Sequence, residues 1–459
     1  MKVDVLVAEI GSTTTVVNGF TQIGTRAPVF IGQGHAPTTV LQGDVRIGLQ
    51  GAIENLREGL GVEEISYDSM LAASSAAGGL RMTVHGLVYD MTVRAGKEAA
   101  LGAGANIHMT TAGVLRDIDL EEIERIAPNL ILLAGGTDYG ERDTAIKNAE
   151  MLCTLTIKAP VIYCGNVQNQ DMIRRIFEGA GRELYVTENV YPRLDELNIE
   201  PVRALIHRAF EAHITEAPGM AHVRDMVTGT IMPTPGAVME CAQMLHHEIG
   251  DVLVVDVGGA TTDIHSVTEG SEEIALIQIS PEPKAKRTVE GDLGVYVNAE
   301  SLALMVGFDK LAKETGVDVA GVLEDYHPIP RSEEQLALTT SLAWHASSLA
   351  IKRHAGRLRY MYGASGRRAW AEGKDLSKVR WLVATGGALT RLPGRAKILE
   401  RLTKLNESGE MLYPRPGSMR VLEDRHYIMA ALGVLYRDYP EDAALLIKSD
   451  LGISSQADQ

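Results

Sequence analysis

The segment from Val254 to Asp263, VVDVGGATTD, brings two carboxylates, two glycines and two threonine hydroxyls together over a short stretch. Its β-branched apolar beginning predicts a buried strand, and Asp256 lies near the end of that strand. Two glycines at a strand end let the backbone turn tightly, so that main-chain amides can approach a phosphate. A carboxylate at this point can orient Mg²⁺ or a water molecule. The residues expected to bind phosphate are Gly258, Gly259, Ala260, Thr261 and Thr262.

This pattern also occurs in plain tight turns, and two related loops elsewhere in the chain favour the functional interpretation. Near the N-terminus, Val3 to Ile10 predict a strand, and Glu9 lies just before a hydroxyl-rich turn whose expected phosphate-binding residues are Gly11, Ser12, Thr13 and Thr14. Near the C-terminus, Trp381 to Thr385 predict a strand followed by the expected nucleotide-binding residues Gly386, Gly387 and Ala388. Early, central and late loops of this kind predict two half-domains that each offer a loop to one nucleotide.

Length and composition are typical of a soluble enzyme with more than one domain. A chain of 459 residues is too long for a single hydrophobic core of typical size and fits two or more domains. The net charge of −16 argues against nucleic acid or an anionic membrane as the main partner, because both need basic patches. The N-terminus has no signal-peptide pattern and no apolar run approaches the ~20 residues that span a bilayer, so a cytoplasmic protein is expected. The three cysteines form no CxxC pair, which argues against an iron–sulfur cluster or a structural zinc site.

Regular strand–helix alternation between about residues 105 and 215 predicts a parallel sheet covered by helices. The strand at 129–134 ends in Gly135-Gly136-Thr137-Asp138, which is either a further phosphate loop or the ordinary turn after a parallel strand. Further helices are expected at 236–248, at about 424–436 and, as one long region, from Glu333 to Arg359.

One sustained basic stretch leaves its role open. It contains Lys352, Arg353, Arg357, Arg359, Arg367 and Arg368. These residues form either a solvated helix face beside a loop or a surface that clamps a nucleotide or meets an acidic partner. Lys284, Lys286 and Arg287 have the same ambiguity.

The three loops together resemble those of the ASKHA superfamily of ATPases, which includes actin, sugar and acetate kinases and DnaK-type chaperones. The matching segments are Glu9–Thr15 (phosphate-1 hairpin), Asp256–Asp263 (phosphate-2), Thr385–Pro393 (adenosine loop), Pro235–Glu248 and Ile428–Val434 (connecting helices), and Gly291–Gly294. The last segment lies where DnaK-type proteins carry a glycine turn before a nucleotide-contacting helix, which adds Gly291 and Asp292 to the expected cofactor-binding residues. The resemblance implies an α/β fold: a two-lobed, actin-like ATPase with duplicated ribonuclease H-like domains and an additional α/β segment in the first lobe.

The same resemblance implies domain bounds and cofactors. Lobe I would span residues 1–250, with the inserted segment at about 105–215, lobe II would span 251–419, and C-terminal helices at 420–459 would return to lobe I. ATP and Mg²⁺ are the expected cofactors, with Glu9 and Asp256 positioning Mg²⁺ through water. Glu9, Asp256 and Asp263 are the candidate catalytic residues, and Asp256 or Asp263 could accept or relay the proton of an attacking water. The superfamily normally has Asp at the position of Glu9, and the longer side chain could slow hydrolysis.

Within the superfamily, the chain is similar to the GlmL/MutL family of glutamate mutase accessory proteins, which are unrelated to mismatch-repair MutL. The segments that carry this resemblance are Ala73–Met82, Leu133–Asp138 and Thr288–Gly294. It implies an ATP-hydrolysing chaperone that reactivates an adenosylcobalamin-dependent mutase or aminomutase by promoting release of damaged cobalamin. Partners would be subunits of that mutase, and a homo-oligomer is also compatible. Two alternatives stay open: a small-molecule kinase of the same superfamily, in which Asp138 could be the base, and a nucleotide-gated scaffold.

Overall fold

The computed structural model describes residues 1–11, 14–76, 80–216, 219–363 and 366–453. Ser12 and Thr13, both expected to bind phosphate, lie outside these ranges, as does 77–79 of the segment that resembles the GlmL/MutL family. The chain forms two compact units. Unit 1 comprises Met1–Glu240 and Ala430–Leu446, and unit 2 comprises Cys241–Met429 and Ile447–Gln459.

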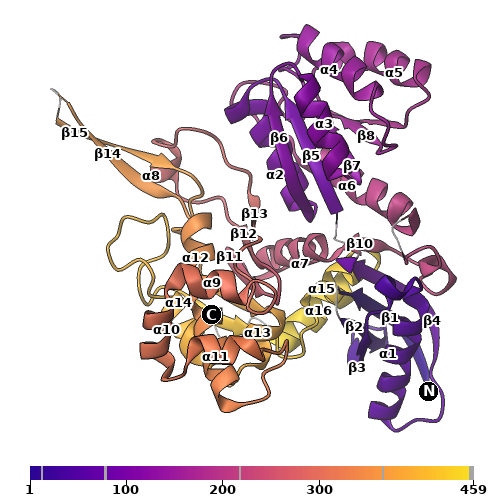
Figure 1. The fold of residues 1–459 in the computed structure, drawn as a ribbon, viewed down its shortest axis with the longest axis vertical. Coiled ribbons are helices and arrows are strands. Elements are labelled where there is room, and N and C mark those ends of the chain that lie inside the picture. The colour runs from indigo at the N-terminus through magenta and orange to yellow at the C-terminus, as the bar shows by residue number, and fades with distance from the viewer. Residues whose placement is uncertain (12–13, 77–79, 217–218, 364–365, 454–459) are drawn as a thin grey trace. The chain divides into compact units, whose positions relative to one another are not determined.

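The first sheet of unit 1 has the strand order β10-β4-β1-β2-β3 (Figure 1). Strands β1, β2 and β3 are antiparallel neighbours, whereas β4 runs parallel to β1 and β10 runs parallel to β4. The bounds are β1 Lys2–Ile10, β2 Thr14–Thr21, β3 Val29–Pro37, β4 Ser66–Ser74 and β10 Ile231–Pro233. Helix α1 (Val45–Leu60) packs on β2 and β3.

The central sheet of unit 2 repeats this arrangement with the order β13-β12-β11-β16-β17. Strands β11, β12 and β13 are antiparallel neighbours, and β16 and β17 continue the sheet in parallel beyond β11. The bounds are β11 Val252–Val257, β12 Thr262–Val267, β13 Ala285–Glu290, β16 Trp381–Thr385 and β17 Arg420–Glu423. The same order and the same strand directions in both units confirm the predicted α/β fold with a duplicated ribonuclease H-like sheet.

Helices of unit 2 cover one face of this sheet, with Leu253, Val255 and Ile264 packed in a core that includes Leu342 and Ala346 of α12. The helices that lie within unit 2 are α8 Glu272–Ala275, α9 Ala299–Val306, α10 Phe308–Thr315, α11 Val319–Glu324, α12 Glu333–His354, α13 Gly386–Arg391 and α14 Arg395–Leu402. In the described part of the chain, no helix combines the length and the apolar character needed to cross a bilayer.

Between β4 and β10, the chain of unit 1 forms a second sheet, here called the inserted domain (residues 80–213). Its strand order is β6-β5-β7-β8-β9, and all neighbouring strands are parallel. Helices α2 and α6 share a core with one face of the sheet, and α3, α4 and α5 share a core with the other. The bounds are β5 Leu80–Gly86, α2 Arg94–Gly102, β6 Ala105–Ala112, α3 Asp117–Ile126, β7 Leu130–Leu133, α4 Asp143–Cys153, β8 Val161–Tyr163, α5 Gln170–Gly179, β9 Leu184–Val186 and α6 Glu200–His213. The predicted parallel sheet covered by helices is present, but it begins with β5 at Leu80, before the expected start at about residue 105.

The expected connecting helices are also present, as α7 (Thr234–Ile249) and α15 (Met429–Asp438), and α16 (Pro440–Leu451) follows. Gly433 of α15 lies against the backbone of α7, because a Cβ atom on Gly433 would overlap the carbonyl group of Ala237. A glycine is therefore required where these two helices meet.

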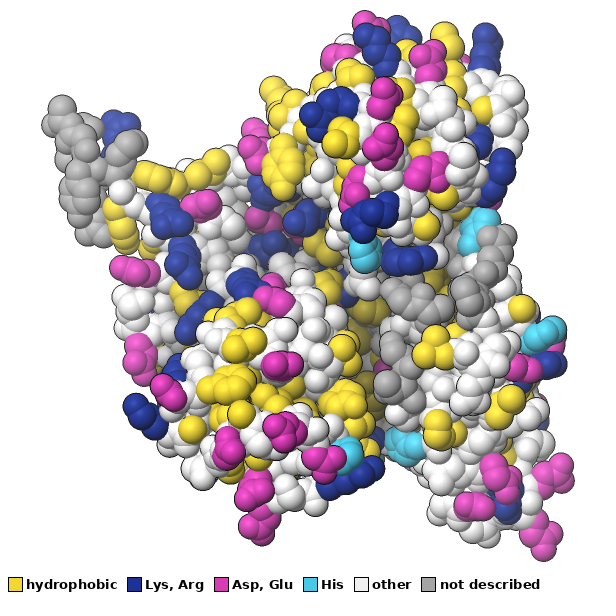
Figure 2. All heavy atoms as spheres, in the orientation of Figure 1, with side chains coloured by type: hydrophobic (Ala, Val, Ile, Leu, Met, Phe, Trp, Pro, Cys, Tyr) yellow, Lys and Arg dark blue, Asp and Glu magenta, His cyan; other side chains and the backbone are white. Residues whose placement is uncertain are grey.

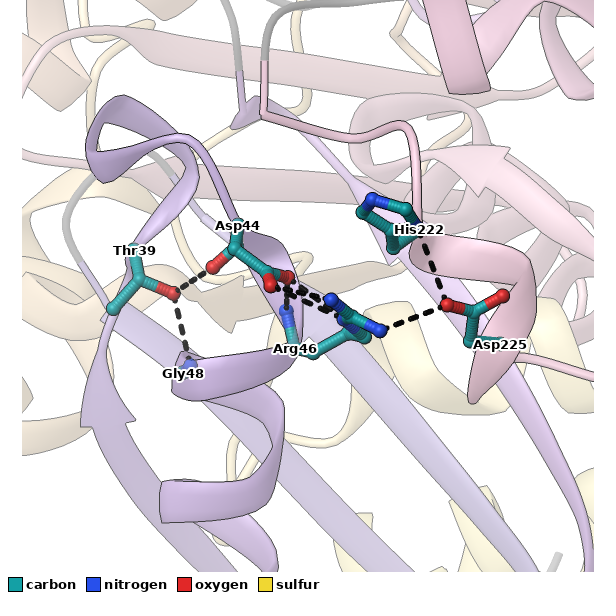
Figure 3. A network of polar contacts seen from close by, with 6 residues as sticks. All are labelled: Thr39, Asp44, Arg46, Gly48, His222 and Asp225. Atoms are coloured by element: carbon teal, nitrogen blue, oxygen red, sulfur yellow. Dashed lines mark hydrogen bonds and ion pairs between the residues drawn. The ribbon is translucent and has the colours of Figure 1, made fainter.

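A polar network fixes the start of α1 within unit 1 (Figure 3). Asp44 is the N-cap residue, and its carboxylate accepts hydrogen bonds from the backbone N and from Nε of Arg46 at 2.9 and 3.0 Å. The Arg46 guanidinium also contacts Asp225, which lies 3.3 Å from Nδ1 of His222. The hydrogen bonds from Arg46 lower the pKa of Asp44 to about 2. The network thus ties α1 to the short turn at Val223–Asp225, which precedes β10.

The helical region expected from Glu333 to Arg359 is shorter than predicted. Helix α12 ends at His354, and β14 (Arg357–Gly363) pairs antiparallel with β15 (Gly366–Glu372). The change occurs at Gly356, where a Cβ atom would lie only 2.6 Å from the carbonyl oxygen of Glu372. A glycine lets the two strand ends approach this closely, so the chain leaves the helix here and the basic residues that follow it form a hairpin.

Candidate nucleotide-binding site

Each unit contains a hairpin with the same turn after its central strand. In unit 1, the amide of Gly11 donates to the carbonyl of Thr14 at 3.0 Å, and in unit 2 the amide of Gly258 donates to the carbonyl of Thr261 at 2.9 Å. An acidic residue lies two positions before each glycine, Glu9 in β1 and Asp256 in β11. The duplicated sheets therefore present two equivalent acid–turn arrangements.

The turn of unit 2 is supported from behind by the segment that follows β13. The amides of Val295 and Tyr296 donate to the carbonyls of Gly258 and Gly259 at 3.2 and 2.9 Å, and Nδ2 of Asn298 donates to the carbonyl of Ala260 at 2.7 Å. These contacts hold the carbonyl groups of the turn. Gly259 and Ala260 are exposed, and their amides donate no hydrogen bond to another described residue. Consecutive amides left open at a turn form a concave donor surface suited to a phosphate oxygen.

The two threonine hydroxyls of this turn are used within the protein. Thr262 is buried and donates to the carbonyl of Leu293 at 2.7 Å, whereas Thr261 donates to Oδ2 of Asp263 at 3.1 Å. These hydroxyl contacts fix the shape of the turn, and the amides of the exposed residues Gly259 and Ala260 are the donors that it offers to a phosphate.

Asp263 forms a buried ion pair with Arg287. Nε of Arg287 lies 2.9 Å from Oδ1 of Asp263, and the two side chains are 0% and 9% exposed. Asp263 is also the direct cross-strand partner of Asp256. Like charges on directly opposite residues are destabilising. Arg287 on β13 compensates the negative charge of Asp263. The position of Asp263 is therefore set by Arg287 as well as by its own strand.

The adenosine-loop residues begin beside Asp256. Thr385 of β16 pairs with Asp256 in the parallel register, and Gly386 follows with φ of 83° as the first residue of α13. A Cβ atom on Gly386 would overlap Oδ1 of Asp256 and would lie 2.6 Å from both N and O of Val257. In contrast, a Cβ atom on Gly387 would meet nothing within 4 Å. The two glycines differ in role: Gly386 permits close strand packing, while Gly387 faces open space.

A buried carboxyl group lies behind this loop. Asp424 is 0% exposed and accepts hydrogen bonds from Oγ1 of Thr385 at 2.8 Å and from the amides of Ile428 and Met429 at 2.8 and 3.1 Å. Burial, followed by the charge of Asp450, raises the pKa of Asp424 to about 7. Asp424 thereby joins the residue before the adenosine loop to the first turn of α15.

Two expected residues of unit 2 lie on helices or pair with them: Ala388 is buried in α13, and Asp292 is paired with Arg353 of α12. The carboxylate of Asp292 accepts hydrogen bonds from Nη1 and Nη2 of Arg353 at 2.7 and 3.0 Å, and Nη1 of the same guanidinium also donates to Glu290 at 2.6 Å. The hydrogen bonds from Arg353 lower the pKa of Asp292. Gly291 precedes this pair and has open space where a side chain would lie.

In unit 1, Glu9 is buried to 7% exposure and lies opposite Val16 on β2 and Ala73 on β4. Gly11 is required at the turn, because a Cβ atom there would lie 2.8 Å from the carbonyl oxygen of Thr14. Thr14 is exposed and begins β2.

These residues fit a nucleotide with Mg²⁺ better than a metal centre built from protein ligands alone. Within the described ranges, no group of three or more His, Cys, Asp or Glu residues could hold a metal ion. Mg²⁺ commonly uses only one or two carboxylates, together with waters and substrate phosphates. The partly exposed Asp256 beside the open amides of Gly259 and Ala260 provides that donor set.

The structure also shows residues whose role the sequence left open or did not indicate. Arg287 and Arg353 belong to basic stretches of ambiguous role, and both are ion-paired to expected site residues. Asn298 gave no sequence signal. Asp138, the candidate kinase base, lies in the inserted domain and accepts hydrogen bonds from Nδ2 of Asn189 and the amide of Val167, both at 2.9 Å. These contacts join the loop after β7 to the loops that follow β8 and β9.

Comparison with known proteins gives a family match along almost the whole chain. Residues 5–451 match the family model described as MutL protein. Protein MutL from Clostridium tetanomorphum is 38% identical over 428 residues, which cover 90% of this chain and 92% of that protein.

Two solved structures are similar at low TM-scores. The nucleotide-free diol dehydratase-reactivating factor has a TM-score of 0.39 and 12% identity, covering 96% of this chain and 100% of that one. A glycerol dehydratase reactivase has a TM-score of 0.30 and 10% identity, covering 94% and 99%. At these TM-scores, neither similarity bears on function.

Proposed function

This chain belongs to the MutL protein family, as its sequence indicated, and on this premise we propose that it is an ATP-binding and hydrolysing accessory chaperone. Its proposed task is to reactivate an adenosylcobalamin-dependent mutase or aminomutase by promoting release of damaged cobalamin. The partners would be subunits of that mutase, and the proposed location is the cytoplasm.

The observation that carries ATP binding is the repeated acid–turn arrangement at Glu9–Thr14 and Asp256–Thr261. In unit 2, open backbone amides, a partly exposed carboxylate and the Gly386–Gly387 turn lie on neighbouring strands. This combination supports binding of phosphates by the hairpin and of adenosine by Gly386, Gly387 and Ala388.

Each site residue then has a specific proposed task. The amides of Gly259 and Ala260 would hold phosphate oxygens, and the equivalent turn at Gly11–Thr14 would contribute in the same way in unit 1. Glu9 and Asp256 would orient waters around Mg²⁺, which supplies charge neutralisation on the phosphates when it is bound. Asp263, held by Arg287, would direct its carboxylate toward Asp256 and assist proton transfer from the attacking water.

The test is reactivation of a mutase that has been inactivated by turnover. Purified glutamate mutase is inactivated with its substrate, and this protein is added with Mg²⁺, free adenosylcobalamin and either ATP, ADP or a non-hydrolysable ATP analogue. Recovery that requires ATP supports the proposal. Absence of recovery with this mutase and with a panel of other adenosylcobalamin-dependent mutases would overturn it.

The kinase alternative gains no support from the residue suggested for it, because Asp138 is engaged by Val167 and Asn189 in the inserted domain. ATP consumption that depends on a metabolite and yields a phosphorylated product would nevertheless favour a kinase. ATP-dependent light scattering would favour a nucleotide-gated scaffold.

A further inference from the structure

The hairpin formed by β14 and β15, here called the arginine hairpin (residues 357–372), has a charge opposite to that of the whole chain. It contains Arg357, Arg359, Arg367 and Arg368 but only one acidic residue, Glu372, whereas the complete chain has a net charge of −16. The described arginines of the hairpin, Arg357, Arg359 and Arg368, are exposed, and Nε of Arg359 lies 3.1 Å from Glu372. The hairpin is thus a local basic surface on an acidic protein.

Among the described residues, the arginine hairpin is a two-stranded sheet, with single bridges from Gln278 to Ala371 and from Met411 to Arg357 at its base. It extends beyond the central sheet of unit 2, with α8 beside it (Figure 1). Near its base, the amide of Ile279 donates to the carbonyl of Ala371 at 3.1 Å, and the amide of Ala371 donates to the carbonyl of Ile277 at 2.9 Å. On the other edge of the base, the amide of Leu358 donates to the carbonyl of Glu410 at 3.0 Å. The base of the hairpin is therefore held on unit 2, whereas its outer part has two strands and would be stabilised further by packing against a partner.

Large apolar side chains are exposed at the segment that pairs with the hairpin. Leu276 is 87% exposed and Ile279 is 62% exposed. The strand register places Leu358 opposite Ala371 and Tyr360 opposite Ala369, so these four side chains share one face of the hairpin. Figure 2 shows hydrophobic and basic side chains beside each other along this projection. Clusters of exposed apolar side chains commonly mark protein interaction sites.

We propose that the arginine hairpin, together with Leu276 and Ile279, is the surface by which unit 2 contacts an acidic protein partner that carries an apolar patch. This partner is the mutase, so the proposal rests on the proposed function. Arg357 and Arg368 pair with acidic side chains of the partner, and Leu276 and Ile279 bury against its apolar patch. Nucleic acid would satisfy the arginines but would leave Leu276 and Ile279 in water, and it would be repelled by the remainder of this acidic chain.

The test compares two variants of the full-length protein with matched controls. The apolar variant is L276S/I279S and the charge variant is R357Q/R368Q. The controls are L304S/I329S, which replaces side chains that are 66% and 75% exposed elsewhere in unit 2, and K313Q/K397Q, which removes two other exposed charges of that unit. Binding to glutamate mutase is measured by surface plasmon resonance at several salt concentrations, and ATP hydrolysis is measured without mutase.

Both hairpin variants are expected to bind the mutase at least about tenfold more weakly and to lose ATP-dependent reactivation, because charged and apolar interface groups each contribute measurably. Their basal ATP hydrolysis and melting temperature should match the wild type, and both control variants should bind normally. Only the charge variant should lose the salt dependence of binding.

The outcomes separate this proposal from the proposed function. Hairpin variants that bind and reactivate the mutase as the wild type does would overturn the docking proposal alone. A wild-type protein that binds the mutase through the hairpin but restores no activity would overturn the proposed function alone. If the wild-type protein neither binds nor reactivates any mutase of the panel, both fail, and tighter binding of the hairpin to DNA or RNA than to any mutase would also overturn the docking proposal.

Discussion

Gly386 lies so close to Asp256 that a Cβ atom on Gly386 would overlap Oδ1 of the Asp256 carboxylate. This close approach results from the parallel pairing of β11 with β16, in which Asp256 is opposite Thr385, the residue before Gly386. The expected adenosine loop and the expected metal-positioning carboxylate are therefore one packed arrangement. A substitution of Gly386 would therefore displace the carboxylate of Asp256.

Substitution of the two glycines should have different consequences. Gly386→Val forces Asp256 and the backbone of Val257 to move, so both ATP binding and the melting temperature should fall. A Cβ atom on Gly387 would meet nothing within 4 Å, so the melting temperature of Gly387→Val should stay close to that of the wild type. If adenosine lies against Gly387, however, the ATP affinity of Gly387→Val should fall by about tenfold or more. Calorimetric titration with ATP and thermal unfolding measure both effects. Wild-type ATP affinity in Gly387→Val would remove this turn from the binding site.

Asp256→Asn should separate binding from hydrolysis. Asparagine keeps the size of the side chain but loses the charge that orients the waters of Mg²⁺, so the rate of ATP hydrolysis should fall by about a hundredfold while nucleotide binding is reduced much less. The matched control is Asp309→Asn, at an exposed carboxylate of α10. Single-turnover hydrolysis at saturating ATP distinguishes the two variants. Equal rates in Asp256→Asn and the control would contradict the assigned role of Asp256.

The Asp263–Arg287 pair should contribute strongly to stability, because loss of one partner leaves a buried charge without compensation. Arg287→Met should lower the free energy of unfolding by about 3–5 kcal/mol. The double variant D263N/R287M should be more stable than the sum of the two single changes predicts. At the exposed Glu400–Lys404 pair, Lys404→Met should change the free energy of unfolding far less than Arg287→Met does. Urea unfolding of Asp263→Asn, Arg287→Met, the double variant and Lys404→Met tests this prediction. Additive effects of the two buried substitutions would show that Asp263 and Arg287 are not coupled.

Asp424 should make the stability of unit 2 depend on pH near neutrality. Its pKa is raised from 3.8 to about 7 by burial and by Asp450, so the folded protein retains a proton that the unfolded chain releases. The stability contributed by this proton is complete below the unfolded pKa and is lost as the pH rises through the folded pKa. Urea unfolding from about pH 4 to about pH 8 should therefore show a decrease that is absent in Asp424→Asn.

Asp450→Asn provides the companion measurement. Removal of the neighbouring charge should lower the pKa of Asp424 and shift the decrease in stability to lower pH. An unchanged midpoint in Asp450→Asn would mean that burial alone sets the pKa.

The amino-acid sequence by itself determined the local elements. The glycine-rich turns at 258 and 386, the alternation of strands and helices in the inserted domain, and the helices at α7 and α15 all follow from apolar periodicity and turn residues near each other in the chain. The family resemblance also rested on short segments of sequence, and it is confirmed over residues 5–451. These signals are readable because each depends on neighbours within a few residues.

The tertiary structure decided which of these residues meet. Arg287 pairs with Asp263 only because β13 lies beside β12, and Thr385 reaches Asp424 only because β17 lies beside β16. Residues 357–359, which begin the arginine hairpin, were predicted as the end of a long helix, because the contact of Gly356 with the carbonyl of Glu372 joins residues that are distant in sequence. Pairings of this kind depend on strand order and burial, and these are properties of the whole fold rather than of any local pattern.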